Sequence, residues 1–288
     1  MTARILDGRA VAAQIRSEVA ERVRALADHG IVPGLAAVLV GEDPASRIYV
    51  GAKHKACADV GIRSEQVNLP GYVTSGEMLA TIRRLNRDPE IHGIIVQLPL
   101  PAHVHELDIQ RTMAPEKDVD GLHPWNVGMV VRGEATFQPA TPYGIVELLL
   151  RSGIALEGAE VVVVGYGDLV GAPLSIMLAQ DSIRGNATVT ITHAKTAQLA
   201  AHTRRADILV AAAGVPRLIT PEMVKPGATV IDVGVHRTDD GLVGDVDFDG
   251  VAEVAGAVTP VPGGVGPMTV AMLLVNTVTA AERQVYGE

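Results

Sequence analysis

Val161-Val-Val-Val-Gly165-Tyr-Gly167-Asp-Leu-Val-Gly171-Ala-Pro-Leu174 is the stretch that decides the fold of this 288-residue chain. Four consecutive valines predict a buried parallel strand, and the run then passes into glycines and an apolar helix. Glycine allows a sharp turn that brings backbone amides and a helix N-terminus against a pyrophosphate. The third glycine comes one residue later than in G-x-G-x-x-G, so an ordinary structural turn remains an alternative.

Strands and helices alternate on both sides of this stretch. The strands are expected over 34–40, 64–69, 92–98, 160–164, 187–192, 207–213 and 228–235. The helices are expected over 10–26 and 75–86, with a further helix that carries Tyr49 and Lys53. Glycine and proline are frequent between 118 and 144, which indicates a domain boundary. The pattern predicts two α/β domains around a cleft, the second a Rossmann-type doubly wound parallel sheet.

Composition excludes several classes of function. The net charge is −9 and the sequence pI is near 5.5, with no basic block, which argues against a nucleic-acid or anionic-membrane surface. No apolar run approaches the roughly 20 residues of a membrane helix. The chain has one cysteine, Cys57, and its first residues lack the apolar stretch of a signal peptide. We therefore expect a cytoplasmic protein that binds a small molecule.

Tyr49 and Lys53 are one helical turn apart and hence on one face. An aromatic ring suits stacking, and a partly desolvated lysine suits proton transfer, although a solvated lysine is the more common case. Gln97 closes an apolar strand at the end where open α/β sheets bind ligands. Asp120 adds a carboxylate at the domain boundary, where sites commonly form.

The segment after the second strand of the glycine-containing unit bears on the choice of dinucleotide. An NAD site usually places a carboxylate there, and His193-Ala-Lys195-Thr196 offers none. These side chains favour a ribose phosphate, so NADP is expected, with a solvated strand end as the alternative. The loop Thr259-Pro-Val-Pro-Gly-Gly-Val-Gly-Pro-Met-Thr269 is glycine-rich and precedes a helix, which suits either ligand binding or an interdomain turn.

Several longer motifs resemble one known family, the bifunctional 5,10-methylenetetrahydrofolate dehydrogenase/5,10-methenyltetrahydrofolate cyclohydrolases. The resemblance runs nearly end to end and occurs in the family's order. Its carriers are Val40-Gly-Glu-Asp-Pro-Ala-Ser46 with Tyr49-Val-x-x-Lys53-x-Lys55, Val96-Gln-Leu-Pro-Leu-Pro101, Lys117-Asp-Val-Asp-Gly-Leu-His-Pro124, Val230-Ile-Asp-Val-Gly234 with Gly244-Asp-Val246, and Pro260-Val-Pro-Gly-Gly-Val-Gly-Pro-Met-Thr269.

The resemblance implies a function and residue roles. The enzyme would oxidise 5,10-methylenetetrahydrofolate with NADP and hydrolyse the methenyl product to 10-formyltetrahydrofolate, which serves purine biosynthesis, without a metal. Lys53 would be the acid/base group, Gln97 would orient it, Tyr49 would stack on the folate and Asp120 would accept hydrogen bonds from the pterin. Further folate contacts would come from Leu98, Pro262, Gly263 and Gly264. Cofactor contacts would come from Thr141, Gly165, Tyr166, Gly167, Val170, Gly171, His193, Lys195, Thr196, Ala213, Gly214, Gly234, Val235 and Thr269.

The resemblance also implies domain bounds and an assembly. Residues 1–120 with 266–288 would form a folate-binding catalytic domain that the C-terminal helix closes, and 121–265 would form the dinucleotide-binding domain. Two such chains would form a homodimer.

Two departures from the family pattern leave alternatives open. Many members carry arginine and serine where this chain has Tyr166 and Gly167, so an NAD-preferring dehydrogenase is the first alternative. Ala140-Thr-Pro-Tyr143 stands where relatives commonly have Cys-Thr-Pro and a basic residue. A non-catalytic dinucleotide or folate sensor is a further alternative, and the residues without the resemblance would also suit a shikimate-dehydrogenase-like reductase.

Overall fold

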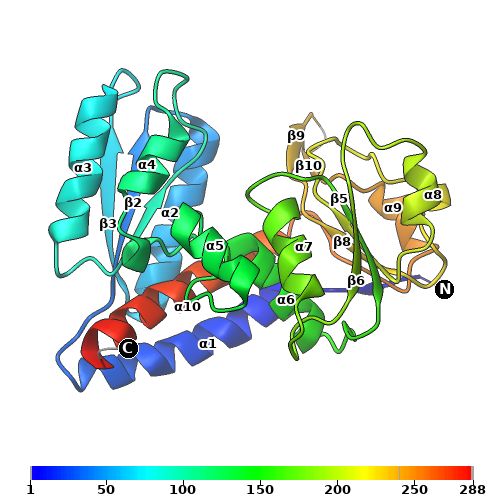
Figure 1. Ribbon diagram of the computed structural model, residues 1–288, viewed down its shortest axis with the longest axis horizontal. Helices are drawn as coiled ribbons and strands as arrows, with labels where there is room; N and C mark the ends of the chain where they lie inside the picture. Colours follow the sequence, from blue (N-terminus) through cyan, green and yellow to red (C-terminus); the bar gives the residue numbers. More distant parts are fainter. Residues whose placement is uncertain (1, 240, 287–288) are drawn as a thin grey trace. The chain divides into compact units, whose positions relative to one another are not determined.

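The computed structural model describes residues 2–239 and 241–286, and these residues form two compact α/β units (Figure 1). Unit 1 comprises Met1–Ala13, Val130–Glu134 and Thr141–Thr269, and unit 2 comprises Gln14–Met129, Ala135–Ala140 and Val270–Glu288. Parallel strands form the main sheet of each unit. The two-domain α/β fold is therefore confirmed, while the cleft and the domain bounds expected above stay predictions.

Unit 2 is built on a three-stranded parallel sheet in the order β3-β2-β4. The strands are β2 (Gly34–Val40), β3 (Arg63–Leu69) and β4 (Gly93–Val96), and every residue of β2 is buried. The helix α3 (Ser75–Arg87) buries Met78, Ile82 and Leu85 in the same core as β2. Its apolar residues recur at three- and four-residue spacing, which explains why this helix was predictable.

The helix α2 (Pro44–Val60) carries two of the predicted site residues. It begins where the Asp43 carboxylate accepts a hydrogen bond from the Ser46 amide at 2.7 Å, and Pro44 lies in its first turn. It ends at Gly61, whose φ of 83° is left-handed. Both ends of α2 are thus fixed by local chemistry.

The segment rich in glycine and proline is more regular than the sequence suggested. It contains α5 (Pro124–Arg132) and the start of α6 (Ala140–Arg151), after α4 (Glu106–Thr112) and a short 3-10 turn, η1 (Pro115–Lys117). Buried Asp118 organises the approach to α5, since its carboxylate accepts from the amides of Leu122 and His123 and from the Asn126 side chain. The local sequence around the start of α5 does not predict a helix, and the hydrogen bonds to Asp118 hold this segment together.

Unit 1 contains a six-stranded parallel sheet in the order β1-β11-β8-β7-β5-β6. Its strands are β1 (Arg4–Ile5), β5 (Glu160–Val164), β6 (Thr188–Thr192), β7 (Ile208–Ala211), β8 (Thr229–Asp232) and β11 (Ala257–Val258). The connections include α7 (Gly171–Ala179), α8 (Leu199–Thr203), a short 3-10 turn η2 (Pro221–Met223) and α9 (Phe248–Ala252). A separate antiparallel pair, β9 (His236–Thr238) with β10 (Gly241–Val243), follows β8.

The order of these strands contains a topological switch point. β6 and β7 flank β5 on opposite sides, so the chain reverses direction across the sheet between β5 and β7. Ligands of open α/β sheets bind at the carboxyl ends of the strands at such a switch point. The predicted glycine turn follows β5, so the doubly wound sheet expected from the sequence is confirmed with its turn at the switch point.

Two long helices, α1 (Gly8–Ala27) and α10 (Val265–Tyr286), contribute residues to both units. α10 is the one helix among the described residues whose length and composition would suit a membrane span. That test is weak evidence, because a buried helix of a soluble core passes it as well. In α10, Leu273, Leu274 and Val278 are buried, as expected for a core helix.

Asn276 of α10 fixes a segment that carries site residues. Its side-chain amide is buried and donates to the carbonyl oxygens of Val119 at 2.8 Å and Gln138 at 3.0 Å. Val119 lies between Asp118 and Asp120, so this contact sets the path of the backbone at both carboxylates.

We predict that Asn276→Leu destabilises the protein by about 2–4 kcal/mol, because two buried carbonyl oxygens lose their donor. Urea unfolding followed by circular dichroism measures the change. Gln284→Leu, at an exposed position of the same helix, is the matched control and should change stability little. An Asn276 variant as stable as this control would contradict the assignment.

Candidate active site

In unit 2, Lys53 of α2 meets Gln97 at the carboxyl end of β4. The Lys53 Nζ donates to the Gln97 Oε1 at 3.2 Å. The Gln97 side-chain nitrogen donates to the Leu98 carbonyl at 2.7 Å, and its backbone amide donates to the Val38 carbonyl of β2. The sheet thus fixes the backbone of Gln97, and Leu98 orients its amide so that the oxygen faces the lysine.

Asp120 lies within electrostatic range of the same lysine. Burial raises the pKa of the Asp120 carboxyl, the Lys53 ammonium lowers it, and the nearby Asp118 carboxylate raises it. Leu98 and Asp120 line one small cavity of about 30 Å³ beside β4. The structure therefore brings Lys53, Gln97, Leu98 and Asp120 together in one unit, and their roles stay predictions.

Tyr49 lies one turn before Lys53 on α2, and its side chain is about half exposed. A ring this exposed is available to pack against a planar ligand. Asp118, by contrast, was not singled out by the sequence reasoning. Burial raises the pKa of its carboxyl, against the hydrogen bonds from Asn126, His123 and Leu122 that lower it, so Asp118 supports the segment around Asp120.

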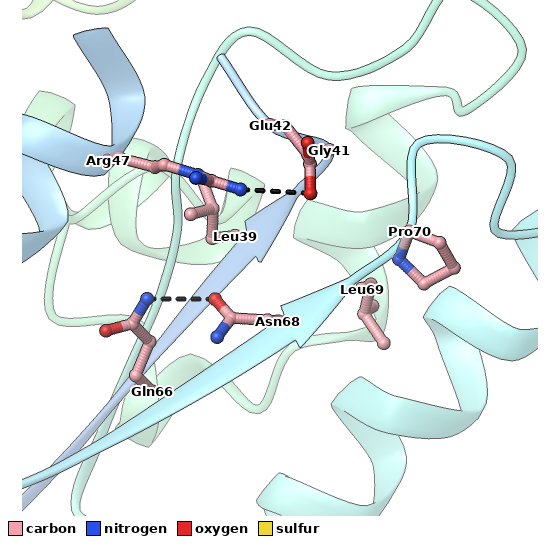
Figure 2. Close-up of a pocket in the computed structure, with 8 residues that line it drawn as sticks. All are labelled: Leu39, Gly41, Glu42, Arg47, Gln66, Asn68, Leu69 and Pro70. Carbon is pink, nitrogen blue, oxygen red and sulfur yellow. Dashed lines mark hydrogen bonds and ion pairs between the residues drawn. The ribbon is translucent and has the colours of Figure 1, made fainter. Parts of the chain in front are cut away.

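A second, larger pocket in unit 2 does not share these properties. It measures about 520 Å³ and is open at the carboxyl ends of β2 and β3 (Figure 2). Two contacts join its polar side chains: Arg47 pairs with Glu42 at 3.0 Å, and the Gln66 side-chain nitrogen donates to Asn68 at 2.8 Å. Both contacts are drawn in Figure 2. None of the residues that line this pocket belongs to the predicted site.

In unit 1, the glycine turn has the close contacts that its sequence requires. Gly165 has a φ of 116°, and a Cβ there would collide with the Ala212 carbonyl oxygen. A Cβ on Gly171 would collide with the Gly165 carbonyl oxygen, whereas Gly167 faces open space. The turn leads into the N-terminus of α7, so backbone amides and open space occur together, as a pyrophosphate site needs. The residues therefore fit a dinucleotide.

The remaining residues predicted to contact the cofactor lie in loops of unit 1, except Thr141 and Thr269, which lie in α6 and α10. Tyr166 and Val235 are exposed, and Val170 directly precedes α7. Beyond β6, the Thr196 hydroxyl accepts from the His193 amide at 2.9 Å, and the His193 Nδ1 accepts from the Lys195 amide at 3.1 Å. These contacts form a compact turn that carries a histidine and a lysine.

Two further groups of predicted residues also lie in unit 1. The hydroxyls of Thr141 and Thr269 lie 3.0 Å apart, and the loop with Pro262, Gly263 and Gly264 precedes α10. Gly263 has a φ of 118°, and its carbonyl accepts from the Arg9 amide at 3.2 Å. The loop is thus tied to the start of α1.

Ala213, Gly214 and Gly234 follow β7 and β8, at the same end of the sheet as the glycine turn. The amides of Ala213 and Gly214 donate to the buried carboxylate of Asp245, a residue that sequence reasoning quoted only as part of a motif. Tyr143, which had no assigned role, packs its ring under the Arg184 guanidinium at 5.5 Å. That arginine also pairs with buried Glu147, which bonds Arg151 as well.

Comparisons with known proteins agree with this geometry. A model of the catalytic domain of tetrahydrofolate dehydrogenase/cyclohydrolases matches residues 6–120, and a model of their NAD(P)-binding domain matches residues 139–285. The bifunctional protein FolD of Bordetella avium is 56% identical over 98% of this chain and 99% of that protein.

Solved structures give the same result. The bifunctional FolD dehydrogenase/cyclohydrolase of Campylobacter jejuni is 46% identical, with a TM-score of 0.94 over 98% of this chain and 99% of that one. The Trypanosoma brucei enzyme, solved with NADP cofactor and an inhibitor, is 42% identical, with a TM-score of 0.93 over 99% of both chains. This chain belongs to the tetrahydrofolate dehydrogenase/cyclohydrolase family.

Proposed function

We propose that this chain is a bifunctional enzyme that oxidises 5,10-methylenetetrahydrofolate with NADP and hydrolyses the methenyl product to 10-formyltetrahydrofolate. The observation that carries the proposal is the 3.2 Å contact between Lys53 and Gln97 beside Asp120, in a chain that also holds a glycine turn at a sheet switch point. Relatives with full-length matches bear the name of this bifunctional enzyme.

The folate half has a role for each side chain. Tyr49 stacks on the folate, and the Asp120 carboxylate accepts from the amino and ring nitrogen donors of the pterin, since an ionised carboxylate offers acceptors only. Lys53 handles the proton when water adds to the methenyl carbon and the ring opens. Gln97 is its positioning residue, because it holds the amine at a fixed point of the sheet.

The dinucleotide half places the cofactor and adds little chemistry of its own. When bound, NADP accepts the hydride from the methylene carbon. Gly165, Gly167 and the N-terminus of α7 receive the pyrophosphate. By our proposal, the loops after β7 and β8 would hold the other end of the dinucleotide, because they lie at the same sheet edge as the glycine turn. Thr141 and Thr269, whose hydroxyls lie 3.0 Å apart near the starts of α6 and α10, would add side-chain contacts.

The turn after β6 selects NADP over NAD. His193, Lys195 and Thr196 supply a ring nitrogen, an ammonium and a hydroxyl within one turn, and no carboxylate is present among residues 193–196. A ribose phosphate gains charge-assisted hydrogen bonds there, whereas the ribose hydroxyls of NAD would lack their usual acceptor. Tyr166 and Gly167 stand where many family members carry arginine and serine, so one expected phosphate contact is missing, and this motivates the NAD-preferring alternative. Kinetics with both cofactors distinguishes the two.

Assembly and location belong to the same proposal. We expect a cytoplasmic homodimer that acts on one-carbon derivatives of tetrahydrofolate and has no nucleic-acid or membrane partner. A net charge of −9 disfavours anionic polymers and anionic lipid surfaces.

We predict that Lys53→Ala lowers the rate of methenyl hydrolysis by at least about 100-fold, in the range typical of a lost acid/base group. The absorbance of the methenyl species measures hydrolysis, and NADP should still bind, since the glycine turn is in unit 1. Lys55→Ala, which removes an exposed lysine two residues away on α2, is the control and should hydrolyse normally. If Lys53→Ala hydrolysed the methenyl species at the wild-type rate, Lys53 would not be the acid/base group.

We also predict that NADP is preferred to NAD by about tenfold or more in kcat/KM, because a phosphate gains charged hydrogen bonds. Lys195→Ala should raise the KM for NADP by a similar factor and leave the KM for NAD unchanged, so NAD serves as the internal control. Reduced cofactor and methenyl absorbance are followed together with the methylene substrate. Equal or better kinetics with NAD would replace this assignment by the NAD-preferring enzyme, and no turnover with either cofactor would favour a sensor.

A further inference from the structure

Two buried aspartates, Asp232 and Asp245, are joined by a hydrogen bond and bond the loops that follow β7 and β8. The carboxylate of Asp232, the last residue of β8, accepts from the amides of Gly234 at 3.0 Å, Asp245 at 2.8 Å and Val246 at 3.0 Å. The Asp232 amide donates to the Thr259 hydroxyl at 2.7 Å. Asp232 therefore fixes the backbone at the second aspartate, Asp245.

Asp245 in turn holds the loop after β7. One carboxylate oxygen accepts from the amides of Ala213 at 2.7 Å and Gly214 at 2.8 Å. The other oxygen bonds the His236 Nε2 at 2.7 Å. The Asp245 side chain is fully buried, while about a fifth of the His236 side chain is exposed. The described hydrogen bonds of the Asp245 carboxylate thus reach only the Ala213–Gly214 loop and the His236 imidazole.

Two glycines allow the backbone to pack directly against the carboxylates of Asp232 and Asp245. A Cβ on Gly234 would collide with the Asp245 carboxylate, and a Cβ on Gly244 would collide with the Asp232 carboxylate. Burial, with the neighbouring Asp245 charge, raises the pKa of the Asp232 carboxyl to about 6, against the amide hydrogen bonds that lower it. Holding two carboxylates this close is costly in the interior of a protein, so a benefit to function is expected.

The loop that Asp245 holds also touches the glycine turn. The Ala212 carbonyl lies so close to Gly165 that no side chain fits between them. A shift of Ala213 and Gly214 would therefore move the wall of the turn that we propose for the pyrophosphate. The chain of contacts runs from His236 through Asp245 and the Ala213–Gly214 amides to Gly165.

We propose that Asp245 and His236 are positioning residues for the dinucleotide: Asp245 holds the Ala213–Gly214 loop in its cofactor-binding shape, and His236 orients Asp245. The inference rests on the proposed function, since it concerns the same cofactor. Neither residue needs to touch the reacting atoms. A preorganised loop lowers the ordering cost of binding, so the effect falls on cofactor affinity.

His236 is the better residue to vary, because it is partly exposed and Asp245 is not. His236→Ala should weaken NADP binding about fivefold, in Kd by calorimetry and in KM by kinetics, which is the size of effect that one ordinary hydrogen bond contributes. His236→Gln keeps a side-chain N–H donor and should restore binding to within about twofold. Asp245→Asn, which puts an amide nitrogen in place of one acceptor oxygen, should weaken binding further.

Methenyl hydrolysis and thermal midpoint are measured on the same variants. Hydrolysis should be unchanged in His236→Ala, because every residue proposed to handle the proton lies in unit 2. Asp239→Asn, an exposed aspartate after β9, is the control and should bind NADP normally. The inference would be overturned if His236→Ala bound NADP as tightly as the wild-type protein, or if His236→Ala and His236→Gln lost the same NADP affinity. It would also be overturned if hydrolysis, thermal midpoint and NADP affinity all fell together. Should Asp245→Asn fail to fold, the two His236 variants decide.

Failure of the proposed function gives a different result. A wild-type protein that binds NADP but does not oxidise the methylene folate would contradict the enzyme assignment. The calorimetric comparison of His236→Ala with His236→Gln would still test the positioning role.

Discussion

The absence of a side chain at Gly165 is the constraint on which unit 1 depends. The Ala212 carbonyl packs directly against this glycine, so the end of β5 and the loop after β7 can approach only if residue 165 has no Cβ. That approach closes the switch point of the sheet and aims the N-terminus of α7 at the turn. The Asp245 carboxylate then holds the adjacent amides of Ala213 and Gly214, which keeps the approach in place.

Unit 2 uses the same end of a parallel sheet for a different purpose. Its strand β4 ends at Gln97, whose backbone is bonded to β2 and whose side chain is oriented by Leu98. A sheet with a fully buried central strand is a rigid support, so the amine of Lys53 is held at a defined point. Both units therefore place polar groups on short segments just beyond buried strands, where the sheet supplies precision and the loop supplies chemistry.

The sequence was most informative where a long segment repeats one pattern. The strand 34–40, the strand 160–164 and the helix near 75–86 were predictable, because periodicity or a continuous apolar run determines each of them. Strands of two or three residues, such as β1, β11 and the β9–β10 pair, have no period to detect. Motifs identified Lys53, Gln97 and Asp120 as a group. The roles of His236, Asp245 and Asp118, by contrast, depend on hydrogen bonds that no local pattern of the sequence reveals.

The balance of charge around Asp120 links the two proposed reactions. Oxidation of the methylene carbon leaves a positive charge on the folate, and a neighbouring ionised carboxylate stabilises such a charge. Burial raises the pKa of Asp120, and the Lys53 ammonium lowers it, so Lys53 helps to keep that carboxylate ionised. A variant without the Lys53 charge would lose proton transfer and also raise the pKa of Asp120. By our proposal, hydrolysis and folate affinity are therefore coupled through Lys53 and Asp120, which lie in the same unit.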